Sequence, residues 1–133
     1  REGISEEDIV QASKISGLDE FLGKMPGGYE LVLQDKGNGL SGGQRQAIAL
    51  TRALVHKPTH YILDEPTSAM DMNSENHFIN NFKTIIEGST LIVVSHRMPL
   101  VNLVDRIVVM NGGKIVEDGP KDEVLKKLQS QNN

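Results

Sequence analysis

The chain has 133 residues, which suits one domain with a buried core, and its hydrophobic share of 38% and charged share of 24% exclude wholesale disorder. A formal net charge of −4 without a basic stripe argues against a nucleic-acid partner. No cysteine is present to form a disulfide or a thiolate metal site, and no apolar run reaches the about 20 residues that span a bilayer.

The N-terminal third of the chain is predicted to be helical, without strong strand signals. Ser5 before three acidic residues is typical of a capping box, and the apolar spacing that follows stops at Gly17. A second, short helix is predicted over residues 18–23, before the Pro-Gly-Gly sequence of residues 26–28. Residues 29–39 are predicted to form a loop.

A longer helix is predicted to begin at Ser41, whose hydroxyl suits an N-cap, and to end before Pro58. The apolar run 61–63 has the length and the flanks of a buried strand, and the run 90–94 is the strongest strand signal in the chain. Apolar residues at helical spacing predict a helix over 72–86 between these two strands. Three residues compete as its N-cap, namely Asp71, Asn73 and Ser74.

After these strands, residues 106–110 and 114–117 are predicted to form a hairpin around an Asn-Gly-Gly turn, and Pro120 to begin a terminal helix. The alternation of strands and helices predicts an α/β fold with parallel central strands flanked by helices. We expect a helical subregion over residues 1–57 and an α/β core over residues 58–133.

The run Ser41-Gly42-Gly43-Gln44 has the composition of a phosphate-binding helix start. Ser41 is a good N-cap, and the two glycines let another molecule approach the exposed backbone N–H groups. A helix N-terminus also carries partial positive charge, which stabilises an anion there. By itself, however, such a turn is more often only a helix cap.

The second chemical signal is the pair Asp64-Glu65 at the end of a predicted strand, with His96 just after the other strand. If the strands are parallel neighbours, the three side chains emerge at the carboxyl edge of the sheet, where ligands bind. Asp64 would hold Mg²⁺ through water, Glu65 would orient or deprotonate an attacking water, and His96 would contact a γ-phosphate. Each signal alone is more often structural; their order and spacing favour a nucleotide-hydrolysing site.

The residues named above resemble the motifs of ABC-transporter nucleotide-binding domains. Residues 40–44 are similar to the signature motif, and 61–65 to the Walker B strand with its catalytic glutamate. Residues 68–71 are similar to the D-loop, and 95–97 to the switch-histidine loop. Residues 35–37 resemble the exporter-type loop that meets the transmembrane domain, although the usual Gly-Glu-Arg-Gly pattern is altered there.

This resemblance implies a partial P-loop NTPase fold: residues 1–57 would be part of the helical subdomain, and 58–133 the C-terminal part of a RecA-like core. It implies ATP and Mg²⁺ as cofactors and a second nucleotide-binding domain as partner. Ser41, Gly42, Gly43 and Gln44 would act on the partner's ATP, and Asp71 would cross the dimer interface. Further similarity to type I secretion ATPases implies an exporter with its own transmembrane domain, at the cytoplasmic face of the bacterial inner membrane.

The chain contains no Walker A loop, because neither of its Gly-Lys pairs has a Gly five residues earlier or a Ser or Thr after it. It also begins with Arg1. We therefore expect a soluble fragment of a longer polypeptide with negligible ATPase activity of its own. Because upstream strand partners would be missing, the exposed strand edges are expected to make the fragment self-associate or swap elements.

Two other functions remain open from the sequence. The chain could be a truncated half-domain that binds and regulates a partner's ATP site. It could instead derive from a soluble ABC ATPase without a role in transport, an alternative that the exporter-like loop at residues 35–37 disfavours.

Overall fold

The computed structural model describes residues 3–25, 27–30 and 39–131. Their contacts divide the chain into two compact units, residues 1–96 and 97–133, and each is described by itself. The loop predicted to resemble the exporter-type contact, residues 35–37, lies outside the described residues. The division into subregions 1–57 and 58–133 stays a prediction.

The first unit begins with helices, as predicted. Ser5 and Asp8 form the capping box of α1: the Asp8 N–H donates to Ser5 Oγ over 3.1 Å, and the Ser5 N–H donates to Asp8 Oδ2 over 3.0 Å. Gly17 ends the helix with a φ of 76°, a conformation that glycine adopts without strain. The helical elements of this part are α1 (Glu6–Ser16), α2 (Leu18–Leu22), the 3₁₀ turn η1 (Gly28–Glu30) and α3 (Gly42–Leu54).

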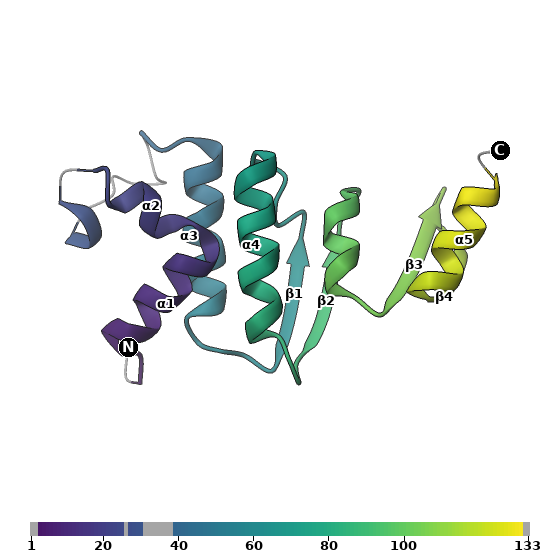
Figure 1. Cartoon of the computed structure of the whole chain (residues 1–133), viewed down its shortest axis with the longest axis horizontal. Coiled ribbons are helices and arrows are strands. Elements are labelled where there is room, and N and C mark those ends of the chain that lie inside the picture. The colour runs from purple at the N-terminus through teal and green to yellow at the C-terminus, as the bar shows by residue number, and fades with distance from the viewer. Residues whose placement is uncertain (1–2, 26, 31–38, 132–133) are drawn as a thin grey trace. The chain divides into compact units, whose positions relative to one another are not determined.

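The sheet of the first unit contains the predicted parallel pair. Strand β1 (His60–Asp64) runs parallel to β2 (Thr90–Val94), with Tyr61 opposite Leu91. The connection is α4 (Met72–Ile85), a crossover helix of the kind that parallel neighbours need. Because the strands are in register, both end at the same edge of the sheet (Figure 1).

One part of the core of this unit lies between α4 and one face of the sheet, and another part lies between α1 and α3. Phe78 and Phe82 are fully buried and stacked, with ring centroids 5.1 Å apart, and the ring of Tyr61 meets Phe82 edge-on at 5.2 Å. Burial of each phenylalanine side chain contributes about 1.5–3 kcal/mol. The other face of the sheet is bare: Ile62 is 76% exposed and Ile92 54%.

The second unit contains the predicted hairpin and the terminal helix. Strand β3 (Arg106–Asn111) pairs antiparallel with β4 (Lys114–Pro120), and α5 (Lys121–Gln131) packs on them. A 3₁₀ segment, η3 (Met98–Leu103), comes before β3. Pro120 was predicted to begin the helix; it instead ends β4, because its fixed φ and missing N–H are tolerated at a strand end, and α5 begins one residue later.

None of the helices in residues 3–25, 27–30 and 39–131 combines the length and the apolarity that crossing a bilayer requires.

Candidate functional site

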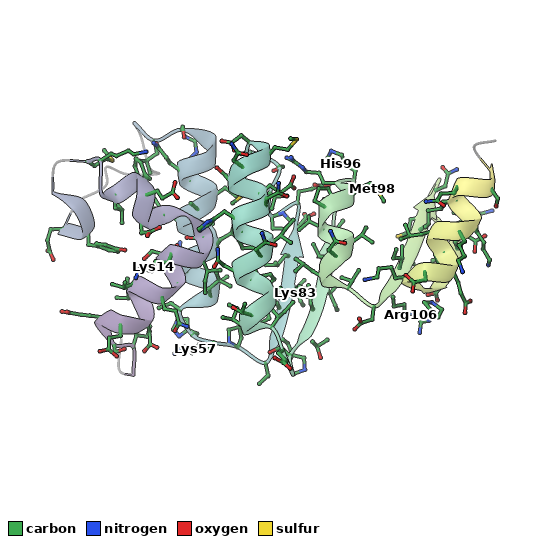
Figure 2. All side chains as sticks on the ribbon, viewed as in Figure 1. Lys14, Lys57, Lys83, His96, Met98 and Arg106 are labelled. Atoms are coloured by element: carbon green, nitrogen blue, oxygen red, sulfur yellow. The ribbon has the colours of Figure 1, made fainter. Side chains whose placement is uncertain are left out.

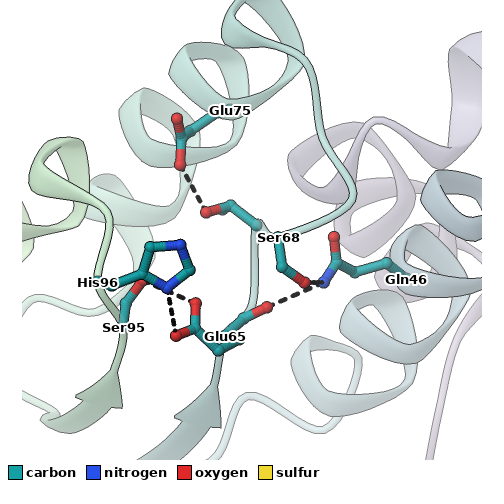
Figure 3. A network of polar contacts seen from close by, with 7 residues as sticks. Gln46, Glu65, Ser68, Glu75, Ser95 and His96 are labelled. Carbon is teal, nitrogen blue, oxygen red and sulfur yellow. Dashed lines mark hydrogen bonds and ion pairs between the residues drawn. The ribbon is translucent and has the colours of Figure 1, made fainter.

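Glu65 and His96 meet at the carboxyl edge of the sheet. Glu65 directly follows β1, and its N–H donates to the carbonyl of Val94 over 2.8 Å, which extends the parallel ladder by one residue. His96, labelled in Figure 2, has its Nδ1 2.8 Å from Glu65 Oε1, and the Ser95 hydroxyl donates to Oε2 over 3.1 Å (Figure 3). The structure therefore brings two of the predicted site residues into direct contact and adds Ser95 to them.

The electrostatics of this contact favour an ionised Glu65. The hydrogen bond from His96 holds the pKa of the Glu65 carboxyl below its ordinary value, with a smaller contribution from Ser95 and partial burial acting in the opposite direction. Since a carboxylate only accepts hydrogen bonds, Nδ1 of His96 must carry a proton. The imidazole is 81% exposed, so its Nε2 remains open to a ligand.

Asp64, the residue predicted to hold Mg²⁺ through water, is the last residue of β1. Its side chain is exposed and takes part in no hydrogen bond or ion pair with the described residues. No group of three or more His, Cys, Asp or Glu side chains among the described residues could hold a metal ion. A Mg²⁺ ion at Asp64 would take its other ligands from water and phosphate, as Mg²⁺ sites with one or two carboxylates do.

The first turn of α3 presents backbone N–H groups without helical acceptors. Ser41 and Gln44 form a capping box: the Ser41 N–H donates to Gln44 Oε1 over 2.7 Å, and the Gln44 N–H donates to Ser41 Oγ over 3.2 Å. The N–H groups of Gly42 and Gly43 lie in the same turn, where an α-helix supplies no carbonyl for them. Since Ser41 and Gly42 are exposed, an anion can reach this end of the helix.

Asp71, the other predicted binding residue, is the N-cap of α4. The Ser74 N–H donates to its Oδ1 over 2.8 Å, and the Ser74 hydroxyl donates to Oδ2 over 3.2 Å. The pKa of Asp71 is lowered mainly by the backbone N–H of Ser74. The structure thus decides among the three cap candidates, while Asp71 remains exposed at the surface.

The predicted site residues on α3, 41–44, and those at the edge of the sheet form two separate groups. Within the described residues, no hydrogen bond or ion pair joins residues 41–44 to Asp64, Glu65 or His96. The link between them is Gln46, on the second turn of α3, whose amide contacts the loop after β1 (Figure 3). Sequence reasoning missed Gln46 because its side chain is one polar position among several on the helix, and nothing local indicates what it faces.

Comparison with known proteins gives a consistent picture. The family profile described as ABC transporter matches residues 5–68. The cyclolysin secretion/processing ATP-binding protein CyaB of Bordetella pertussis is 45% identical over 125 residues, which cover 94% of this chain and 18% of that protein. The alpha-hemolysin translocation ATP-binding protein HlyB of Escherichia coli is 44% identical over 128 residues, which cover 96% of this chain and 18% of that protein.

Among solved structures, a bacterial Atm1-family ABC exporter with ATP bound matches with a TM-score of 0.84 and 29% sequence identity. The match covers 96% of this chain and 22% of that one. It confirms the predicted fold class. The chain therefore spans less than a quarter of the length of each of these three proteins.

Proposed function

This chain belongs to the ABC transporter family, and from that premise we propose that it is part of the ATP-hydrolysing subunit of an exporter for type I protein secretion. The observation that carries the proposal is the contact of Glu65 with His96 at the edge of a parallel sheet, in a chain about 45% identical to secretion ATP-binding proteins. Such a carboxylate beside a phosphate-facing histidine suits phosphoryl transfer to water.

Glu65 is proposed to orient the attacking water. Its carboxylate is ionised, because His96 and Ser95 both donate to it, and each oxygen keeps acceptor capacity for a water. His96 Nδ1–H is committed to Glu65, so the exposed Nε2 is the atom that would contact the γ-phosphate. Asp64 would hold Mg²⁺ through water, and this ion would neutralise charge that develops on the phosphates.

Ser41, Gly42, Gly43 and Gln44 are proposed to serve a second copy of the domain. The N–H groups of the first turn of α3 would donate to the phosphates of ATP held by the partner, and Asp71 would lie at the interface between the two domains. Because the site is then shared between chains, and because this chain has no Walker A loop, we expect no ATP turnover from the chain alone.

The parent protein is proposed to work at the cytoplasmic face of the bacterial inner membrane, joined to the transmembrane domain of an exporter. This chain alone would not fill that role. The bare face of the sheet, with Ile62, Ile92 and Val94 exposed, is proposed to make the isolated chain self-associate, since parallel strands are normally covered on both faces.

A chimera tests the function. The segment of CyaB that matches this chain is replaced by residues of this chain, and ATP hydrolysis and cyclolysin export are measured in membranes. We expect both activities in the chimera. Glu65→Gln is expected to lower the turnover by about 10²–10⁴-fold, the usual contribution of a residue that positions or deprotonates water.

Glu87→Gln, an exposed glutamate beyond the end of α4, is the matched control and should hydrolyse ATP like the unsubstituted chimera. Hydrolysis without export would contradict the assignment to secretion. Full turnover with Glu65→Gln would contradict the role of Glu65, and turnover by the isolated chain would contradict the shared site.

A further inference from the structure

The side-chain amide of Gln46 uses both of its ends on the loop that follows β1. Its Nε2 donates to the carbonyl of Glu65 over 3.0 Å and to the hydroxyl of Ser68 over 3.1 Å (Figure 3). The Ala69 N–H donates to its Oε1 over 3.0 Å. The partners are 19 to 23 residues away in the sequence. The side chain of Gln46 thus hydrogen-bonds to three residues of the loop, Glu65, Ser68 and Ala69.

The chemistry of the partners requires an amide at this position. The carbonyl of Glu65 can only accept and the N–H of Ala69 can only donate, so only one orientation of the Gln46 amide satisfies both. A glutamate of the same shape would keep the acceptor for Ala69 but place a carboxylate oxygen against the Glu65 carbonyl. A methionine of similar length would offer neither donor nor a strong acceptor.

The loop that Gln46 holds contains a strained residue. Glu65 has a φ of 44°, in the left-handed region that residues with a Cβ seldom adopt and that persists only where the surroundings impose it. Its carbonyl accepts from Gln46 and from the Ser68 N–H, and its N–H donates to Val94. The backbone of Glu65, the proposed catalytic residue, is therefore hydrogen-bonded to β2, to its own loop and to α3.

The same loop also lies against the first turn of α3. A Cβ added at Gly43 would come within 3.2 Å of the Ala69 carbonyl, and one added at Gly42 within 3.7 Å of Ala69 Cβ. Ala69 therefore contacts α3 at two places: at the glycines where the helix starts, and at the side chain of Gln46 one turn further along. The two groups of predicted site residues are connected by this segment.

We propose that Gln46 is a positioning residue, which ties the Glu65–Ala69 loop to α3 so that the carboxylate of Glu65 and the phosphate-facing turn of α3 keep a common geometry. The expected effect of Gln46 on ATP hydrolysis rests on the function proposed above for Glu65 and α3. The hydrogen bonds that connect the Glu65–Ala69 loop to α3 do not depend on that function. The Gln46 amide fixes the Glu65 carbonyl at the point where the chain leaves β1. Without this amide, the backbone of Glu65 could shift and its side chain could move away from His96.

The tie is tested by NMR on the isolated chain with Gln46→Met, Gln46→Glu and Gln11→Met. Gln11 is an exposed glutamine on α1 and serves as the matched control. In both Gln46 variants we expect the Ala69 or Ser68 backbone signals to shift and the Glu65 pKa to rise toward its ordinary value. In Gln46→Met the Ala69 amide should also exchange about five- to tenfold faster, the effect of one lost hydrogen bond.

A native pKa of Glu65 in Gln46→Met would overturn the proposal. So would native behaviour of Gln46→Glu, because it would show that only the shape of the side chain matters. A general loss of stability would speed amide exchange throughout the unit, whereas loss of the tie speeds exchange first in the loop at residues 65–69. The Gln11→Met control should leave the loop unchanged.

The chimera supplies the second measurement. Gln46→Met is expected to lower kcat for ATP hydrolysis by about a hundredfold, the effect of a displacement near 1 Å at a catalytic group, with KM for ATP unchanged. A rise in KM with native kcat would contradict a positioning role. If the unsubstituted chimera is inactive, the proposed function fails, but the NMR comparison still decides whether Gln46 positions Glu65.

Discussion

Glu65 shows how the chemistry of a residue follows from its partners. The residue sits one position beyond β1, in a left-handed conformation, with His96 on one carboxylate oxygen and Ser95 on the other. Both donors stabilise the charged form of the carboxyl. The candidate site is therefore a carboxylate that is kept ionised and oriented by the two residues that directly follow β2.

The first prediction concerns the pKa of Glu65. His96→Ala removes the main hydrogen bond, so the pKa should rise toward 4.5, and Ser95→Ala should raise it less. Because the folded chain lowers this pKa, its contribution to stability is complete above about pH 4.5 and is lost as the pH falls through the folded value. A carboxyl-carbon NMR titration measures the shifts, and an unchanged pKa in His96→Ala would contradict the contact.

At the scale of elements, side-chain caps define where three helices begin. Ser5 caps α1, Ser41 caps α3 and Asp71 caps α4, and each satisfies an N–H group that the helix leaves without an acceptor. The glycines that follow the cap of α3 lie against Ala69, and the cap of α4, Asp71, comes two residues after Ala69. The same local interaction thus sets the helix starts and the positions of two predicted site residues, Ser41 and Asp71.

The second prediction follows from the cap of α4. Asp71→Ala should lower the free energy of unfolding by about 1 kcal/mol, the usual cost of a lost N-cap. Asn73→Ala, two residues further along the same helix, should change it little, because the Asn73 side chain does not cap the helix. Urea unfolding followed by circular dichroism measures both variants, and equal losses would argue against Asp71 as the cap.

On the scale of the whole molecule, the sheet of the first unit is covered on one face only. The buried residues of β1 point toward α4, whereas Ile62, Ile92 and Val94 are 76%, 54% and 58% exposed on the other face. Each strand also has only one partner among the described residues. Apolar strands with bare faces and edges favour pairing with other chains.

The third prediction is that the chain associates as its concentration rises. Sedimentation velocity over a concentration series should show a species larger than a monomer. Replacing Ile62 and Ile92 together by Thr, which keeps β-propensity, should return the chain to the monomer. Met72→Gln, at an equally exposed apolar residue on α4, should not. A monomer at every concentration would contradict the proposal.

Most of the fold could be predicted from the sequence because the signals are local. The apolar run at 90–94 gave the bounds of β2 without error, and the capping residues located the starts of α1 and α3. The boundary at Pro120 was one residue off, because a proline suits both the end of a strand and the start of a helix. The sequence does not decide which residue caps α4, because Asp71, Asn73 and Ser74 all have side chains that can cap a helix.

Caps, periodicity and motifs act over a few residues, so the helices, the strands, the family resemblance and the residue types of the candidate site could all be predicted from local sequence. Local sequence does not predict that His96 and Ser95 both contact the carboxylate of Glu65, or that Gln46 binds the loop after β1. These contacts join residues 19 to 31 positions apart, and they exist only once α3, β1 and β2 have packed together. Through Gln46, α3, whose first turn is proposed to bind phosphate, is hydrogen-bonded to the loop that carries Glu65.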